Sequence, residues 1–78
     1  MKIPRDIDGI GLAKSLSRFG YEITRQTGSH IRLTTALNGE HHITIPAHRP
    51  LKIGTLNSTL SEIADHFKIS KHDILEKL

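Results

Sequence analysis

Three short runs in the middle of the chain alternate apolar and polar residues, and this alternation limits the fold more than any other feature. The runs are YEITRQ at 21–26, HIRLTT at 30–35 and HHITIP at 41–46. A period of two is typical of half-buried β-strands, and short turns between consecutive strands favour antiparallel pairing. Asn38-Gly39 is a hairpin signal, and Pro46 ends the third strand because it cannot donate to a ladder. The sequence therefore predicts a three-stranded antiparallel sheet.

Helical patterns lie on both sides of the predicted sheet. In GIGLAKSLSRFG the apolar residues follow helical spacing, with Asp8 as the predicted N-cap and Gly20 as the C-terminal glycine. TLNSTLSEIADHF has the same spacing with Thr55 as the predicted N-cap, and SKHDILEKL predicts a short last helix beginning after Ser70. We therefore expect one α+β domain over residues 1–78, in which helices cover one face of the sheet.

The alternation assigns each strand residue to one face of the sheet. The side chains predicted to form the core under the helices are Ile23, Ile31, Leu33, Ile43 and Ile45. Those predicted on the exposed face are Thr24, His30, Arg32, Thr34, His42 and Thr44. Arg25 falls on the core side by the same counting, so we expect it to be an edge residue with its charged end in water.

Length and composition favour a small cytoplasmic protein of one domain. The chain has 78 residues, no cysteine, and a net charge of +3. This length suits a single domain, and the lack of cysteine suits a reducing cytosol. Because no run has the length of a secretory signal or a membrane span, we expect a cytoplasmic protein that does not enter a membrane.

Histidine is unusually frequent, with six in the chain. A metal site is one use for them. His41 and His42, however, point to opposite faces of a predicted strand and cannot easily share an ion. No His-Glu-x-x-His helix or cysteine completes a ligand set. We therefore expect neither a metal nor a cofactor.

Several stretches in order resemble the HicA mRNA interferase toxins, also called the YcfA-like family. The most specific is Gly28-Ser29-His30, supported by HITIP at 42–46 and GTL at 54–56. The resemblance extends over essentially the whole chain. It implies a double-stranded-RNA-binding-domain-like α-β-β-β-α fold, an endoribonuclease that cleaves mRNA, and a HicB-type antitoxin as partner.

The resemblance also implies a catalytic residue, because the essential histidine of the family maps onto His30. RNA cleavage without a metal needs a base for the 2′-hydroxyl, an acid for the 5′-oxygen and positive charge at the phosphate. Histidine suits the proton transfers because its pKa is about 6.5. Arg32, two residues on, is a candidate to hold the phosphate. Gly28 and Ser29 are interpreted as turn residues that aim His30.

Other RNA contacts are predicted around this histidine. The candidate RNA-binding residues are Arg32, His42, His48, Arg49 and Lys52, the last two near the start of the second predicted helix. Either His42 or His48 is a candidate for the second proton-transfer group. The expected products are a 2′,3′-cyclic phosphate and a 5′-hydroxyl.

Two alternatives to the nuclease stay open: an RNA-binding module of the same fold that does not cut, and an inactive partner-binding domain. Thr27, Ile53 and Asn57 stand where the family often has basic residues, which slightly favours the RNA-binding module. The expected partners are mRNA and a HicB-type antitoxin, with the free protein a monomer or a weak homodimer.

Overall fold

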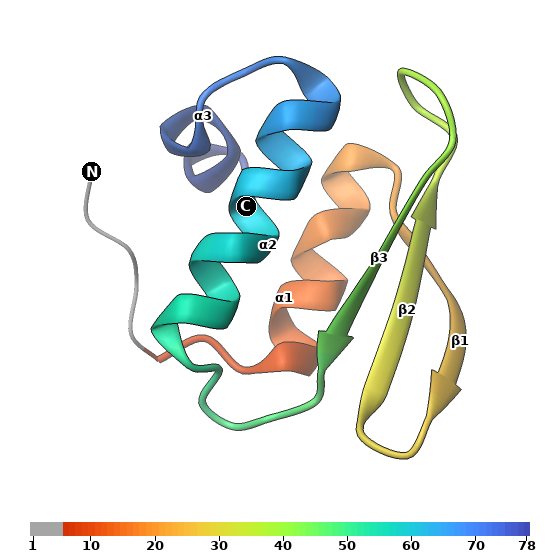
Figure 1. The fold of residues 1–78 in the computed structure, drawn as a ribbon, viewed down its shortest axis with the longest axis vertical. Coiled ribbons are helices and arrows are strands. Elements are labelled where there is room, and N and C mark those ends of the chain that lie inside the picture. The colour runs from red at the N-terminus through yellow and green to blue at the C-terminus, as the bar shows by residue number, and fades with distance from the viewer. Residues whose placement is uncertain (1–5) are drawn as a thin grey trace.

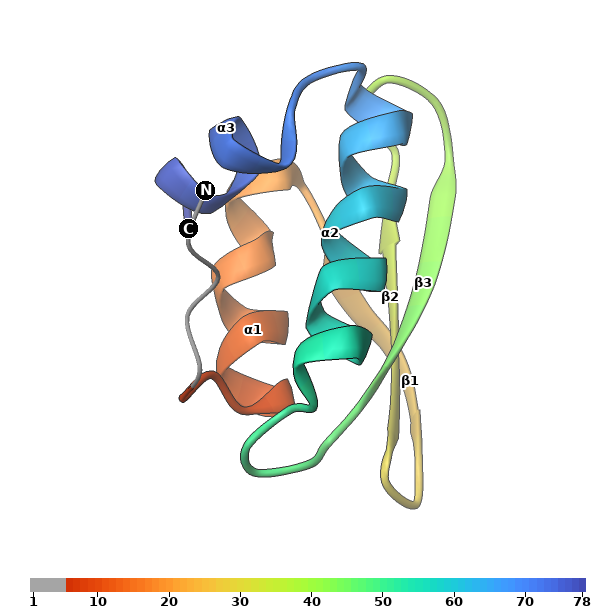
Figure 2. The same cartoon turned by 60° about the vertical axis from the view of Figure 1, so that its left-hand side comes forward.

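Helices and sheet form two layers in the computed structural model, which describes residues 6–78 (Figures 1 and 2). The elements are α1 (Gly9–Ser15), a 3₁₀ turn η1 (Leu16–Phe19), β1 (Glu22–Thr27), β2 (His30–Thr35), β3 (His41–Pro46), α2 (Ile53–Phe67) and α3 (Lys71–Glu76). The strands form one antiparallel sheet in the order β1-β2-β3. The predicted α+β arrangement is confirmed. The first five residues of the predicted domain lie outside the described part.

Tight turns of defined backbone geometry join the strands. Gly28 has a φ of 58°, and Thr27 pairs with His30 across the two-residue turn. Glycine with positive φ at the first central position is typical of a type II′ hairpin turn. Asn38 and Gly39 also have positive φ, at 56° and 96°. Local turn chemistry therefore explains both hairpins that the sequence predicts.

The hydrophobic core lies between the sheet and the helices. Ile31, Leu33, Ile43 and Ile45 are buried, as the alternation predicts. The helices contribute Leu12, Leu16, Phe19, Leu56, Leu60 and Ile63. The only buried polar side chains in the described part are Thr35 and Thr59. The hydroxyl groups of both donate to backbone carbonyls, so this burial leaves no polar atom unpaired.

The prediction that Ile23 joins the core is wrong. Ile23 is 49% exposed, and every residue of β1 is exposed. The helices pack mainly over β2 and β3, so the outer strand β1 extends beyond their cover. Tyr21, which precedes β1, is instead buried in the core.

The helix ends agree with prediction in two places and disagree in one. Asp8 caps α1 by accepting from the Gly11 N–H at 2.6 Å, and Ser70 caps α3 by accepting from the Asp73 N–H at 3.1 Å. Thr55 is not an N-cap, because α2 begins two residues earlier with Lys52 at the cap position and no capping side chain. No helix in the described part is long and apolar enough to cross a membrane.

Two glycines offer a test of how closely the layers meet. A Cβ on Gly9 would overlap the Pro46 carbonyl oxygen, whereas one on Gly54 would meet nothing within 4 Å. Gly9→Ala should therefore destabilise the fold by about 1–3 kcal/mol. Gly54→Ala should stabilise it by about 0.4–1 kcal/mol through lower chain entropy in the unfolded state. Thermal unfolding of both variants measures the contrast, and equal midpoints would contradict the packing described.

Candidate nucleic-acid interface

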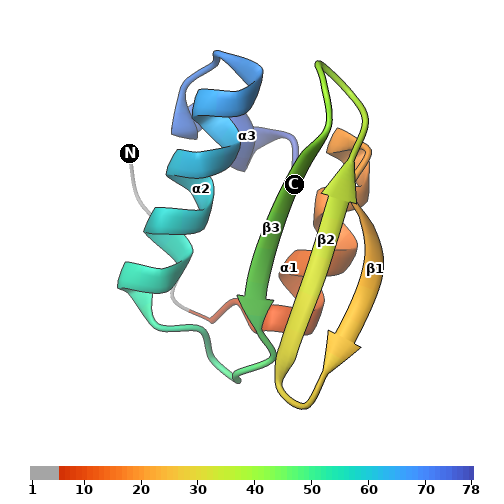
Figure 3. The ribbon, with the colours of Figure 1, turned by 45° about the vertical axis from the view of Figure 1, so that its right-hand side comes forward.

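The uncovered face of the sheet is arranged in three rows of side chains that run across the strands. Its strands can be followed in Figure 3. The His30 row is Thr27, His30 and Pro46; the arginine row is Arg25, Arg32 and Thr44; the third row is Glu22, Thr34 and His42. Successive rows are two residues apart along a strand, which is about 7 Å. The row in which a predicted site residue lies therefore gives its approximate distance from His30 along the sheet.

His30 stands at one end of this face. It is exposed and directly follows the β1–β2 turn. The Ser29 carbonyl accepts from the Ala47 N–H at 2.6 Å, which holds the turn against the start of the β3–α2 loop. A Cβ on Gly28 would meet nothing within 4 Å, so its positive φ, not space, is what calls for glycine. The features that Gly28 and Ser29 contribute to this turn, a positive φ and a carbonyl acceptor, both belong to the backbone.

The arginine row differs from the prediction. A β-bulge between Ile23 and Arg25 shifts the register of β1, so that Arg25 pairs with Arg32 and belongs to the open face. The prediction that Arg25 lies on the core side is wrong because alternation cannot count through an inserted residue. No local signal in the sequence marks this bulge.

Hydrogen bonds join side chains around the third row. The Thr24 and Thr34 hydroxyl oxygens lie 3.0 Å apart, and the Thr34 oxygen lies 2.8 Å from His42 Nδ1. The Glu40 carboxylate is 3.8 Å from His42 Nε2. Four residues of β2 separate this row from His30, or about 13 Å. The structure therefore places His42 on the predicted face but not beside His30.

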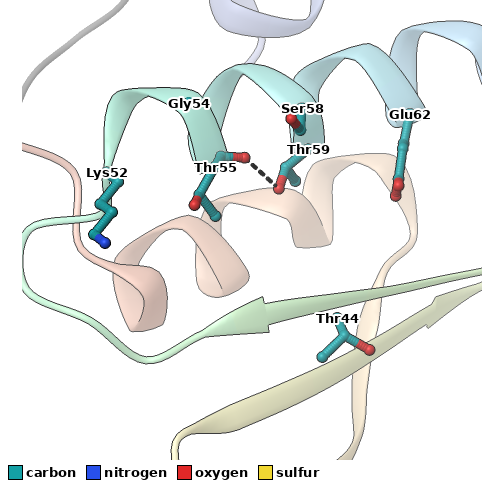
Figure 4. A pocket seen from close by; sticks show the side chains of 7 residues that line it. All are labelled: Thr44, Lys52, Gly54, Thr55, Ser58, Thr59 and Glu62. Carbon is teal, nitrogen blue, oxygen red and sulfur yellow. Dashed lines mark hydrogen bonds between the residues drawn. The ribbon is translucent and has the colours of Figure 1, made fainter.

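A groove continues the arginine row beyond β3 (Figure 4). It is lined by Thr44, Lys52, Gly54, Thr55, Ser58, Thr59 and Glu62. Thr44 is opposite Arg32 in the sheet, and Lys52 is exposed at the uncapped start of α2. The first backbone N–H groups of a helix lack partners within it and favour anions. The groove thus extends from Thr44, the register partner of Arg32, to Lys52, and it also carries the carboxylate of Glu62.

The β3–α2 loop holds the two remaining predicted residues. The Arg49 Nε atom lies 3.4 Å from the Asp8 carboxylate, so part of its charge is compensated within the protein. His48 is exposed, and its carbonyl accepts from the Gly9 N–H at 3.0 Å. Its backbone is two residues from Pro46, the register partner of His30. The backbone of His48 is therefore nearer to that of His30 than the backbone of His42, which is four residues of strand away.

Two other histidines form a cluster at the opposite end of the sheet. The rings of His41 and His66 stack with centroids 4.4 Å apart. The Tyr21 hydroxyl lies 2.7 Å from His41 Nδ1, and His66 Nε2 lies 2.9 Å from the Leu37 carbonyl oxygen. Burial and the charge of Glu62 raise the pKa of Tyr21 to about 12, which keeps its hydroxyl protonated beside His41. Sequence analysis missed this cluster because its members are distant in the chain.

Among residues 6–78, no group of three or more histidine, cysteine or acidic side chains is placed to share a metal ion. The His41–His66 pair uses two of its ring nitrogens on Tyr21 and Leu37. The geometry of this pair is that of a packing contact within the fold.

Comparison with known proteins gives one family. A family model described as HicA toxin of bacterial toxin-antitoxin matches residues 12–64, more than half of the chain. The match includes all three strands and most of α2. Comparisons with curated proteins and with solved structures give no match.

The His41 environment predicts loss of stability in mild acid. Burial lowers the pKa of His41, and His66 and His42 lower it further against the opposing charge of Glu62. Below the unfolded pKa of about 6.5 the unfolded chain binds a proton that the folded protein resists, so the free energy of unfolding falls. Chemical denaturation between about pH 7.5 and pH 5, above the main carboxylate range, measures this loss.

His41→Asn should reduce that acid-side loss while keeping a polar side chain that can hydrogen-bond to the Tyr21 hydroxyl. His72→Asn is the matched control, because His72 pairs with Glu76 on the surface of α3. An equal acid-side loss in the parent and in His41→Asn would contradict the assignment.

Proposed function

The chain belongs to the HicA toxin family of bacterial toxin–antitoxin systems, and we propose that it is an endoribonuclease that cleaves mRNA with His30. The observation that supports this most directly is the position of His30. It is exposed on the uncovered face of the sheet, one row from two arginines. A titratable group beside fixed positive charge is the arrangement that phosphodiester cleavage requires.

The proposed reaction needs a base, an acid and positive charge at one phosphodiester. A base removes the 2′-hydroxyl proton, and the resulting O2′ attacks the adjacent phosphorus. The bond from phosphorus to O5′ breaks as an acid delivers a proton to that oxygen. The products are a 2′,3′-cyclic phosphate and a 5′-hydroxyl. In this proposal His30 is one of the two proton-transfer groups, and the arginine row supplies positive charge one row away on the same face.

Geometry favours His48 over His42 as the second proton-transfer group. His42 is about 13 Å along the sheet from His30. It also contacts Thr34 and lies near Glu40, so its ring is held in the third row. His48 is exposed and belongs to the loop that the Ser29–Ala47 hydrogen bond holds at the His30 end.

Arg32 on β2 and Lys52 at the start of α2 supply positive charge to an RNA backbone that crosses the sheet, although Glu62 lines the same groove as Lys52. The arginine row continues into the groove between β3 and α2, where Lys52 stands at the uncapped helix end. Glu22 and Glu40 lie near the third row, which makes a path along the strands toward that end unfavourable. We therefore place the RNA backbone across β2 and β3, near the His30 end.

The neutralising partner in this proposal is a HicB-type antitoxin that covers the same face. No helix of the described chain lies over it (Figure 2). A protein seated across the His30 row would exclude RNA from the histidine and from the arginines together. Inhibition then needs no change in the fold of the toxin.

Substitution of His30 tests the nuclease directly. His30→Ala should reduce cleavage by about 10²–10⁴-fold with little change in RNA affinity, because the residue transfers protons. The parent and the variant are induced from matched plasmids in a bacterial host, and growth and total mRNA integrity are followed. His72→Ala, an exposed histidine on α3, is the control that should retain activity. A parent that is well expressed and soluble but leaves mRNA intact would favour the RNA-binding module without catalysis.

The second group has its own test. His48→Ala should reduce the cleavage rate constant of purified protein by a larger factor than His42→Ala, because His48 is nearer to His30. Single-turnover cleavage of a short RNA across a range of pH measures both variants. An unchanged pH profile in His48→Ala, with a larger loss in His42→Ala, would reverse the assignment.

A further inference from the structure

We propose that Arg25 and Arg32 together hold one RNA phosphate adjacent to the phosphodiester at His30. This inference rests on the proposed function and adds Arg25. Strict alternation in the sequence predicts this residue on the core side, whereas the structure has it on the open face. The two arginines are direct register partners on β1 and β2. Side chains directly opposite each other in an antiparallel pair have Cβ atoms about 5 Å apart. Two guanidinium groups are therefore presented to one small region of the open face.

This pairing is unfavourable for the free protein. Like charges directly opposite each other destabilise a sheet. Within residues 6–78, neither arginine has a carboxylate within the 4.0 Å of an ion pair. Glu40 lines the same shallow depression as both arginines but lies within ion-pair distance of His42. The pair thus keeps its charge for an anion supplied from outside.

The bulge that creates the pair is held by its own hydrogen bonds. The Thr24 hydroxyl lies 3.0 Å from that of Thr34 and 3.4 Å from the Arg32 carbonyl oxygen. These contacts fix the inserted residue on β1 against β2. Without the insertion, strict alternation would turn Arg25 to the helix side of the sheet. The fold therefore brings Arg25 to Arg32 by a specific local irregularity.

The position of the pair suits a backbone contact rather than base recognition. A guanidinium presents planar donors that match phosphate oxygens, and two of them can share one phosphate. The pair is one row, or about 7 Å, from His30 on the same face. A phosphate held there leaves the neighbouring linkage beside the histidine. Such a contact positions RNA without reading its sequence.

Binding of a short single-stranded RNA in the His30→Ala background tests the proposal without cleavage. Arg25→Gln should weaken binding by roughly tenfold and lower the slope of log affinity against log salt by about one. A DNA of the same sequence should lose the same factor, because the contact is to phosphate. The matched control is Arg18→Gln, an exposed arginine on the helix side, which should change neither quantity.

Two further readouts separate binding from a structural role. The thermal midpoint of Arg25→Gln should equal or exceed that of the parent, since a like-charge contact is removed. The loss in Arg25→Gln/Arg32→Gln should be smaller than the product of the single losses if both hold one phosphate. A lower midpoint with unchanged salt slope would overturn the proposal. So would losses that simply multiply.

Failure of this inference is distinguishable from failure of the proposed function. Cleavage that depends on His30 but not on Arg25 would overturn the phosphate contact alone. Binding that depends on Arg25 in a protein that never cleaves would uphold the contact and overturn the nuclease. If Arg25→Gln weakened antitoxin binding but not RNA binding, the arginine pair would contact an acidic surface of the antitoxin. That result would overturn the proposed phosphate contact.

Discussion

The two-residue turn between β1 and β2 sets the register on which the use of the sheet depends. Side chains alternate between faces, so a slip of one residue would move His30 and Arg32 to the core and Ile31 to solvent. Gly28 allows the turn because its φ is positive, and Thr27 pairs with His30 across it. The register set by this turn therefore decides both which residues of β2 enter the core and which lie on the open face.

Backbone hydrogen bonds hold the surroundings of that turn. The Ala47 N–H donates to Ser29, the Gly9 N–H to His48, and the Leu51 N–H to Ile7. Together they tie the hairpin tip, the β3–α2 loop and the start of α1 at one end of the molecule (Figure 1). The residues proposed for chemistry are thus carried by strands and by a tethered loop. Precise placement by rigid elements is what proton transfer to a bound phosphodiester requires.

Periodicity in the sequence predicted most of the fold. The bounds of β2 and β3 agree with the predicted runs. Both strands are packed against helices, so their apolar residues alternate in sequence as buried and exposed positions alternate in the structure. It failed for Ile23, where an edge strand extends beyond the helices. The capping prediction for Thr55 also failed, because α2 begins at Ile53 without a capping side chain. Both failures occur where tertiary context, rather than local preference, decides the outcome.

The candidate site was predictable only in part. His30, Arg32 and His42 were assigned to the exposed face by alternation, and the structure places them there. Their separation could not be predicted, since it depends on strand pairing. Arg25 could not be found because a bulge breaks the counting on which alternation relies. The stacked His41–His66 pair joins residues that only the packing of α2 brings together.

The bulge in β1 also bears on how the protein behaves in concentrated solution. An exposed edge strand is a template on which another chain can add, and irregular backbone and charged side chains are the features that discourage it. β1 has a bulge between Ile23 and Arg25, and it carries the charged residues Glu22 and Arg25. These features oppose the addition of another strand beside Ile23, which is apolar and 49% exposed. A variant that straightened this strand would therefore become prone to aggregation.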